Sequence, residues 1–186
     1  WAVPTLGSRP HDPLATPDGM LWYTGQFSNR MGRVDMKSGA FKEYPLKTPA
    51  SGPHGLEFDK DGQLWFTANQ KGYIGRLDPK SGEVTEYKMP DEVRDPHTPL
   101  FAPNGMLFFT AQGANTVGRL NPKTGEIKVV KTPTERANPY GVVMTNEIYA
   151  SVLRAEGQFQ KLDRGQIPNY ADLYPIATAA ASHPAS

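Results

Sequence analysis

The chain has 186 residues and a formal net charge of +1, with 38% hydrophobic and 10% aromatic residues. A chain of this length and composition is expected to bury a sizeable core. Basic and acidic residues are interspersed, so the basic stripe that would favour nucleic acid as a partner is missing. The sequence contains no apolar run near the ~20 residues needed to span a bilayer. The absence of cysteine excludes disulfides and thiolate metal sites.

A strict period of 43 residues runs along the chain. The dipeptide Pro-His occurs at residues 10–11, 53–54 and 96–97, and Pro139-Tyr140 stands at the fourth position. Aromatic residues and Gly-Arg pairs keep the same step: Trp22, Trp65 and Phe108; Gly32-Arg33, Gly75-Arg76 and Gly118-Arg119. A fixed period in the forties is the sequence signature of a repeat architecture.

Residues 1–4 open the chain and read as a strand without a blade of its own. Trp1 lies 43 residues before Tyr44, which belongs to the last strand of the first repeat. Many propellers close by letting one terminus complete the blade begun by the other. We therefore expect residues 1–4 to pair with the third strand of the fourth blade; the alternative is an extended N-terminal arm.

Each repeat is expected to contain four short strands, most clearly in its second copy. There the strands are predicted over residues 55–59, 63–68, 73–78 and 83–89, separated by Asp-Gly and Ser-Gly turns in which glycine supplies a positive φ. Four strands in 40–45 residues describe a propeller blade. The sequence thus predicts an all-β protein, a β-propeller with about four blades of four antiparallel strands and no long helix.

The blades are expected to begin at residues 10, 53, 96 and 139, so that the propeller covers residues 1–163. The fourth blade lacks a recognisable fourth strand, and residues 164–186, rich in proline and alanine, are predicted to form an irregular tail. A four-bladed ring, a piece of a larger ring and half of a ring made by two chains all fit this pattern. An array that does not close leaves sheet edges exposed, so it is expected to form a homo-oligomer or join a larger complex.

Three histidines follow the repeat and are the candidate catalytic residues. His11, His54 and His97 stand where each blade enters its innermost strand, at the mouth of the central channel. Neutral imidazole is a general base near pH 7 and a metal ligand. A structural role, with each ring bonded to a backbone carbonyl of the next blade, is an equal alternative.

Two further groups of residues complete the predicted site. Tyr140 takes the histidine position in the fourth blade and suits the wall of a ligand site. The amides Gln26, Asn69 and Gln112 recur two positions after a threonine and are predicted to bind ligand through hydrogen bonds. The recurring aromatic residues and glycines are predicted to pack against one another, and the arginines to pair with loop carbonyls or with acids such as Asp35 and Asp78.

The repeat resembles the virginiamycin B lyase (streptogramin B lyase) family. The likeness rests on Pro53-His54-Gly55, on residues 61–67 (DGQLWFT), on residues 74–79 (IGRLDP) and on residues 85–87 (TEY), and it extends from residue 1 to about residue 163. The resemblance implies a propeller, typically of seven blades, that opens cyclic depsipeptide antibiotics at the ester by elimination, assisted by Mg²⁺. It also implies that a histidine of a Pro-His motif removes the proton and that a glutamate after the Trp-Phe-Thr motif supports the metal.

This sequence departs from that pattern at the glutamate. Gly25, Ala68 and Ala111 follow the three threonines, and none offers the oxygen that Mg²⁺ prefers. No metal ligand set is therefore predicted, and the alternative to a lyase is a non-catalytic propeller that binds a small cyclic peptide-like ligand or a protein partner. A chain that opens on Trp1 without a methionine also favours a processed, periplasmic or secreted protein over a cytoplasmic one.

Overall fold

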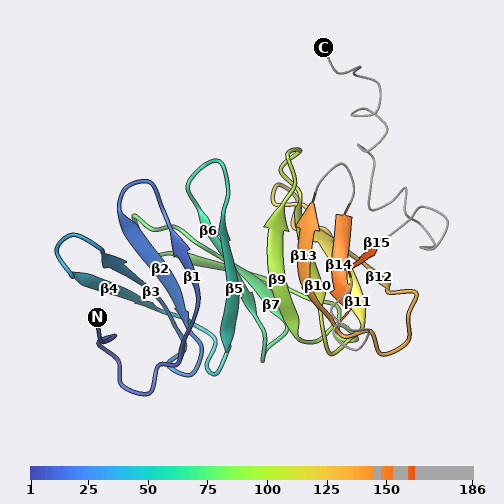
Figure 1. The fold of residues 1–186 in the computed structure, drawn as a ribbon, viewed down its shortest axis with the longest axis horizontal. Helices are drawn as coiled ribbons and strands as arrows, with labels where there is room; N and C mark the ends of the chain where they lie inside the picture. Colours follow the sequence, from blue (N-terminus) through green and yellow to red (C-terminus); the bar gives the residue numbers. More distant parts are fainter. Residues whose placement is uncertain (145–147, 153–158, 162–186) are drawn as a thin grey trace, which may run out of the picture.

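All regular secondary structure in the described part of the chain is β-strand. The computed structural model describes residues 1–144, 148–152 and 159–161, and fifteen strands fall within them. The strands form antiparallel sheets that stand side by side along an arc (Figure 1). The described residues contain no helix that could cross a membrane. The predicted all-β propeller architecture is confirmed.

Each sheet is a blade whose strands follow one another in chain order. Blade one contains β1 (Pro10–Ala15), β2 (Met20–Gly25), β3 (Arg30–Asp35) and β4 (Phe41–Pro45). Blade two contains β5 (Pro53–Phe58), β6 (Leu64–Ala68), β7 (Tyr73–Leu77) and β8 (Val84–Lys88). Blade three contains β9 (Pro96–Phe101), β10 (Leu107–Ala111), β11 (Thr116–Leu120) and β12 (Ile127–Lys131). In blade four the described strands are β13 (Pro139–Met144), β14 (Ile148–Val152) and β15 (Phe159–Lys161).

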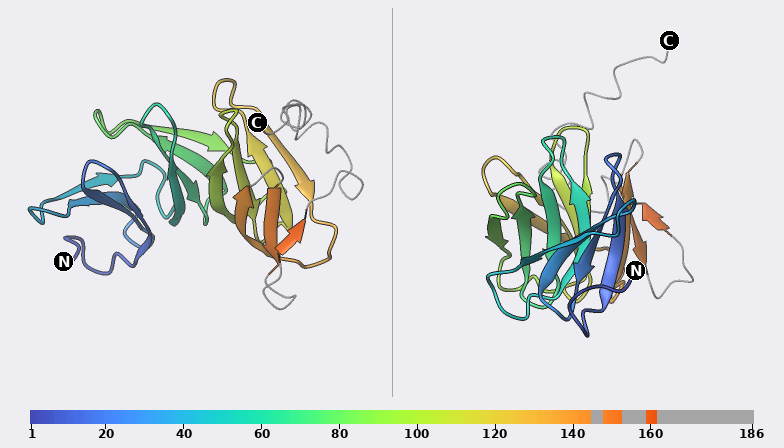
Figure 2. Two further views of the ribbon diagram at one scale, coloured as in Figure 1. Left: turned by 45° about the horizontal axis from the view of Figure 1, so that its top comes forward. Right: turned by 90° about the vertical axis from the view of Figure 1, so that its left-hand side faces the viewer.

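The first strands of the blades form the inner edge of the arc. Strand β1 contacts β5, β5 contacts β9, and β9 contacts β13. The sheets of blade one and blade four lie at opposite ends of this array (Figure 1, Figure 2). The described blades are therefore an open segment of a propeller and not a closed four-bladed ring. The tail predicted for residues 164–186 lies outside the described residues.

The expected closing strand at residues 1–4 is not formed, and that prediction is wrong. These residues carry no strand, and the Trp1 indole lies beside Gly39 of blade one, where an added Cβ would stand 3.0 Å from its Nε1. Trp1 and Val3 line a pocket of about 230 Å³ together with Leu21 and Phe41 on the free face of blade one. The physical reason is distance, because the edge of blade four lies at the far end of the arc.

Glycines inside the blades make room for aromatic rings on the neighbouring strand. Gly75 pairs with Phe66 across β6 and β7, and a Cβ on Gly75 would come within 2.0 Å of the Phe66 ring. The same collision would occur between Gly118 and Phe109, at 2.1 Å. The sequence predicted that aromatic residues pack on these glycines, which is correct. The rings involved, however, are Phe66 and Phe109, each one position after the predicted Trp65 and Phe108.

The recurring tryptophans instead join neighbouring blades. The Trp65 ring stacks on Tyr87 of its own blade at 5.3 Å and meets Phe101 of blade three edge-on at 5.8 Å. The guanidinium of Arg76 lies 5.8 Å from the Trp65 ring, so this arginine covers an aromatic face and does not pair with Asp78 as expected. Such aromatic contacts stabilise the interface between blades beyond the area they bury.

Buried threonine hydroxyls also tie each blade to the next. The hydroxyl of Thr24 lies 2.8 Å from the carbonyl oxygen of His54, and that of Thr67 donates to His97 O at 2.6 Å. Thr110 donates to Tyr140 O at 2.6 Å. All three threonines are fully buried, so these bonds form away from water and fix the inner strands relative to one another.

Replacing Thr67 by valine should weaken this joint. The Thr67 hydroxyl accepts from Gly55 N–H at 2.9 Å as well as donating to His97 O, and valine keeps the shape but removes both bonds. Each buried backbone group left without a partner costs about 1–3 kcal/mol. We expect Thr67→Val to lower the free energy of unfolding by about 2–6 kcal/mol in a denaturant titration.

The matched control is Thr85→Val, the same chemical change on the partly exposed strand β8 of the same blade. It should change the free energy of unfolding by less than about 1 kcal/mol, because within the described part of the chain the Thr85 side chain makes only a 3.4 Å contact from Arg76. Equal effects of the two substitutions would contradict the role assigned to Thr67.

Glu57 is an acid held between two blades. Its Oε2 accepts from the backbone N–H of Phe101 at 3.2 Å. Burial raises the pKa of Glu57 to about 7, although the bond from Phe101 acts in the opposite direction. The folded protein therefore keeps a proton on Glu57 at pH values where an exposed glutamate has lost it.

This pKa predicts a pH-dependent stability. Between the ordinary value of 4.5 and about 7, the folded state binds more protons at Glu57 than the unfolded state. The contribution of Glu57 is full below that window and is lost as the pH rises through it. Glu57→Gln should remove this loss, so its melting temperature should fall less than that of the wild type across the window, as measured by calorimetry.

Glu83→Gln, an equal charge change at an exposed site of blade two, serves as the control and should follow the wild type. A wild-type melting temperature that falls no more steeply than that of Glu57→Gln would show that Glu57 does not hold its proton.

Candidate functional site

Four aromatic rings from four blades stand in a file along the inner edge of the arc. The ring centroids of His11 and His54 are 4.1 Å apart, those of His54 and His97 3.9 Å, and those of His97 and Tyr140 3.9 Å. The structure thus brings together all four residues that the sequence placed at this position. His54 and His97 are buried, His11 is partly exposed, and 40% of Tyr140 is exposed.

Local backbone geometry explains why these rings converge. The residue before each Pro-His or Pro-Tyr pair has a positive φ, which turns the chain into the inner strand. These residues are Arg9, Gly52, Asp95 and Asn138, with φ values of 47°, 58°, 63° and 46°. Such a conformation is uncommon outside glycine, asparagine and aspartate. The repeated turn places the second residue of every inner strand at the same height.

Asp12 lies between the first two histidines. Its Oδ1 is 2.9 Å from His11 Nδ1, and its Oδ2 is 3.6 Å from His54 Nδ1. Burial by itself would raise the pKa of Asp12, but the interactions with His54 and then with His11 outweigh it and hold the pKa below its usual range. The carboxylate is thus ionised beside two imidazoles.

His97 has no such acid in contact and is held neutral. Burial lowers the pKa of His97 to about 4, and the positive charge available on His54 acts in the same direction. Its Nδ1 lies 3.1 Å from the hydroxyl oxygen of Thr98, which fixes the ring from one side. At neutral pH His97 is therefore an uncharged imidazole, and its lowered pKa makes it a weaker base than an exposed histidine.

The three amides lie at the same end of the blades as the histidines but differ from one another. The backbone N–H groups of Gln26, Asn69 and Gln112 each donate to the residue two positions before the inner-strand His of the same blade. The Gln26 side chain is buried, with Oε1 lacking a hydrogen-bond partner. Asn69 is occupied differently, since its Nδ2 donates to Asp95 Oδ1. The amides thus share a position but not an environment.

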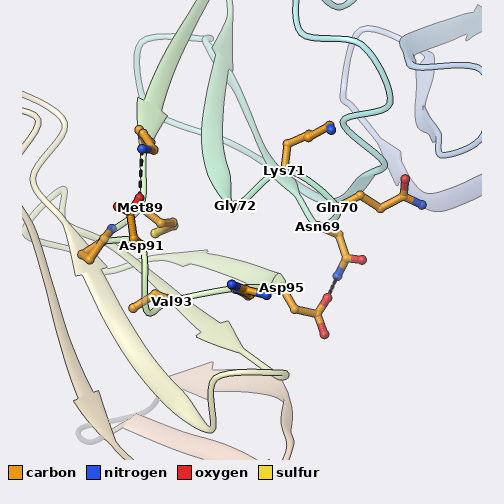
Figure 3. Close-up of a pocket in the computed structure, with 11 residues that line it drawn as sticks. Asn69, Gln70, Lys71, Gly72, Met89, Asp91, Val93 and Asp95 are labelled. Atoms are coloured by element: carbon orange, nitrogen blue, oxygen red, sulfur yellow. Dashed lines mark hydrogen bonds and ion pairs between the residues drawn. The ribbon is translucent and has the colours of Figure 1, made fainter.

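A pocket of about 280 Å³ opens next to Asn69, between blades two and three. The turn after β6 and the connection from β8 to β9 line it, as Figure 3 shows. Asp95 closes one side, where it meets Asn69, and Lys88 pairs with Asp91 at 2.9 Å. Burial raises the pKa of Asp95, while the bonds from Asn69 and from Gly113 N–H counteract it.

The described residues do not fit a magnesium ion. Mg²⁺ requires near-octahedral oxygen ligands, usually one or two carboxylates with water. Gly25, Ala68 and Ala111 offer no side-chain oxygen at the ends of β2, β6 and β10. The carboxylate nearest to His97 in the sequence is Asp95, and it already accepts from Asn69 and Gly113.

Sequence reasoning missed the two acids at this edge. Asp12 and Asp95 do not recur with the repeat, so a search for repeated residues passes over them. A usable signal was present for Asp12, because an acid directly follows a Pro-His pair in blade one alone. Its contact with His54 of the next blade depends on how the blades pack.

Proteins of known structure share this fold. The virginiamycin B lyase from Staphylococcus aureus has a similar structure, with a TM-score of 0.73 and 27% sequence identity over 88% of this chain and 58% of that one. A catalytically inactive form of that enzyme, solved with quinupristin, aligns with a TM-score of 0.76 and 28% identity over 87% of this chain and 57% of that one.

A hydrazine synthase from Kuenenia stuttgartiensis, 16% identical over 89% of this chain and 49% of that one with a TM-score of 0.71, shares the fold alone. No curated protein sequence matches the chain.

The family comparison covers most of the sequence. The chain spans less than three fifths of the solved lyases that it resembles. The sequence model of the virginiamycin B lyase family matches residues 1–162, which include every described strand. On this match, the protein belongs to the virginiamycin B lyase family.

Proposed function

We propose that this protein is a carbon–oxygen lyase that opens a cyclic depsipeptide of the streptogramin B type by elimination, with His97 as the general base. The observation that carries the proposal is the file of three imidazoles and Tyr140 on the inner edge, in which His97 is neutral. Family membership supplies the reaction class, and the residues of this chain supply the base.

Among the three histidines, we assign the base to His97 because no carboxylate of the described residues contacts its ring. The Nδ1 atoms of His11 and His54 face the Asp12 carboxylate, whereas His97 has Thr98 at its Nδ1 and Tyr140 at its face. Tyr140 is 40% exposed, so a ligand that packs on this ring arrives beside His97. Negative charge that develops on the substrate then favours the protonated imidazole.

The elimination balances without water or a redox partner. The imidazole of His97 takes a proton from the carbon next to a substrate carbonyl, and the electron pair of that C–H bond forms a carbon–carbon double bond. The ester C–O bond on the neighbouring carbon breaks, and the ester leaves as a carboxylate. The proton then passes from His97 to solvent, and the product is an open isomer of the substrate.

No step of this reaction is assigned to Mg²⁺, because the described residues do not fit that ion. The ligand is held by groups on the same end of the blades. Tyr140 offers an aromatic wall, and Gln26 offers an amide whose buried oxygen has no partner. Gln112 stands at the equivalent place in blade three, while Asn69 is engaged with Asp95.

The test is to incubate the full chain with quinupristin, the compound present with the inactive relative, and to analyse the mixture by mass spectrometry. Elimination gives a ring-opened product of unchanged mass, whereas hydrolysis adds one water. His97→Ala should lower the turnover by about 10²–10⁴-fold, as expected for loss of a general base. His183→Ala, which removes the histidine furthest from this file in the sequence, is the control and should retain turnover.

A product heavier by one water would contradict the reaction class. Complete absence of a product with the folded wild-type chain would contradict the lyase and leave a ligand-binding propeller. Wild-type turnover in His97→Ala would contradict the assignment of the base.

Magnesium dependence gives a separate prediction. Because the described residues lack an oxygen ligand set for Mg²⁺, adding millimolar Mg²⁺ should leave the turnover within about twofold of its value in metal-free buffer. A large and saturable activation by Mg²⁺ would show that the chain holds this ion after all.

A further inference from the structure

A cluster of metal-ligand type joins the first two blades at the inner edge. His11 and Asp12 of β1 meet His54 of β5, and one ligand atom from each lies within 4.8 Å of the others. The shorter separations are 2.9 Å, from His11 Nδ1 to Asp12 Oδ1, and 3.6 Å, from His54 Nδ1 to Asp12 Oδ2. Two ligands bound at 2.0–2.2 Å to one tetrahedral ion stand about 3.4 Å apart, so two of the three separations are already near this spacing.

The buried Nδ1 atom of His54 lacks a hydrogen-bond partner, and a bound ion would give it one. The residue is only 6% exposed, and its buried Nδ1 has no hydrogen-bond partner. The nearest acid oxygen, on Asp12, is 3.6 Å away and too far for a hydrogen bond. A buried polar atom without a partner is rare and costly, and an ion is one of the standard explanations.

The backbone at Asp12 is built differently from that of the other blades. Asp12 has a φ of 34°, in the left-handed region, where Gly55 and Thr98 occupy the equivalent positions of blades two and three. In those blades the N–H of this residue donates to the buried threonine, from Gly55 to Thr67 and from Thr98 to Thr110.

In blade one the peptide group between His11 and Asp12 is flipped relative to the equivalent peptide of blades two and three. The carbonyl of His11 faces the Thr24 hydroxyl at 2.9 Å, in place of the Asp12 N–H. A left-handed residue other than glycine costs free energy and is retained where the surroundings require it. Here the unusual backbone is accompanied by an acid whose two oxygens lie between His11 and His54.

We propose that His11, Asp12 and His54 bind a divalent transition-metal ion of the Zn²⁺, Co²⁺ or Ni²⁺ class. Two imidazoles and one carboxylate suit these ions, whereas Mg²⁺ takes oxygen ligands. Three protein ligands leave at least one position for water or for a ligand donor at the inner edge. The site uses neither His97 nor Mg²⁺ and is independent of the lyase proposal.

The test is a titration of the full, metal-free chain with Co²⁺, followed by its visible absorption, and then displacement by Zn²⁺. We expect one Co²⁺ per chain and saturation in the micromolar range. Asp12→Asn and His11→Ala, at partly exposed positions, should each weaken binding by more than about tenfold, since even partners outside a ligand set change affinity 10–100-fold. His54→Ala should abolish the absorption band.

Matched controls remove the same chemical groups elsewhere. Asp91→Asn changes an exposed acid that pairs with Lys88, and His183→Ala removes the fourth histidine of the chain. Both should bind Co²⁺ as the wild type does. Circular dichroism and the melting temperature, which bound metal should raise, identify any variant that fails to fold.

Three results would overturn the proposal. The first is a wild-type chain that gives no saturable Co²⁺ band. The second is wild-type affinity in both Asp12→Asn and His11→Ala. The third is displacement of Co²⁺ by Mg²⁺ at concentrations similar to those of Zn²⁺, which would contradict the class of ion.

Discussion

The hydrogen bond from a buried threonine to the inner strand of the next blade is the constraint on which the rest of the structure depends. Thr24, Thr67 and Thr110 reach across to the carbonyls of His54, His97 and Tyr140. Because the acceptor belongs to the residue that carries the functional ring, the bond that joins two blades also sets the height of that ring. Stacking distances near 4 Å follow directly.

Repetition of the fold does not produce repetition of the chemistry. The three histidines share a backbone position, yet His97 is a buried neutral imidazole, while His11 and His54 face the Asp12 carboxylate. The difference arises from the residue that follows each histidine: an aspartate, a glycine or a threonine. One residue that departs from the repeat is therefore enough to give one blade an ionic environment, and in blade one the local backbone at Asp12 changes with it.

Membership of the virginiamycin B lyase family accounts for the fold, while the described residues of this chain do not offer the oxygen ligands that Mg²⁺ prefers. Small side chains follow the three threonines, and Asp95 is engaged by Asn69 and Gly113. Asp12, the acid beside the first two histidines, lies between the imidazoles of His11 and His54. Most potential metal ligands at this inner edge are therefore imidazole nitrogens, whereas Mg²⁺ requires oxygen ligands.

The sequence by itself determined the four-stranded blade and which residues recur in it. The 43-residue period and the turn glycines are local properties that can be read along the chain. It placed His11, His54, His97 and Tyr140 in line for the same reason. Only the tertiary structure decided what lies between blades: Asp12 against His54, Phe101 against Glu57, and Trp1 against blade one in place of blade four. The first two contacts each involve an acid that does not recur with the repeat, and all three depend on how the blades pack along the open arc, which no local pattern encodes.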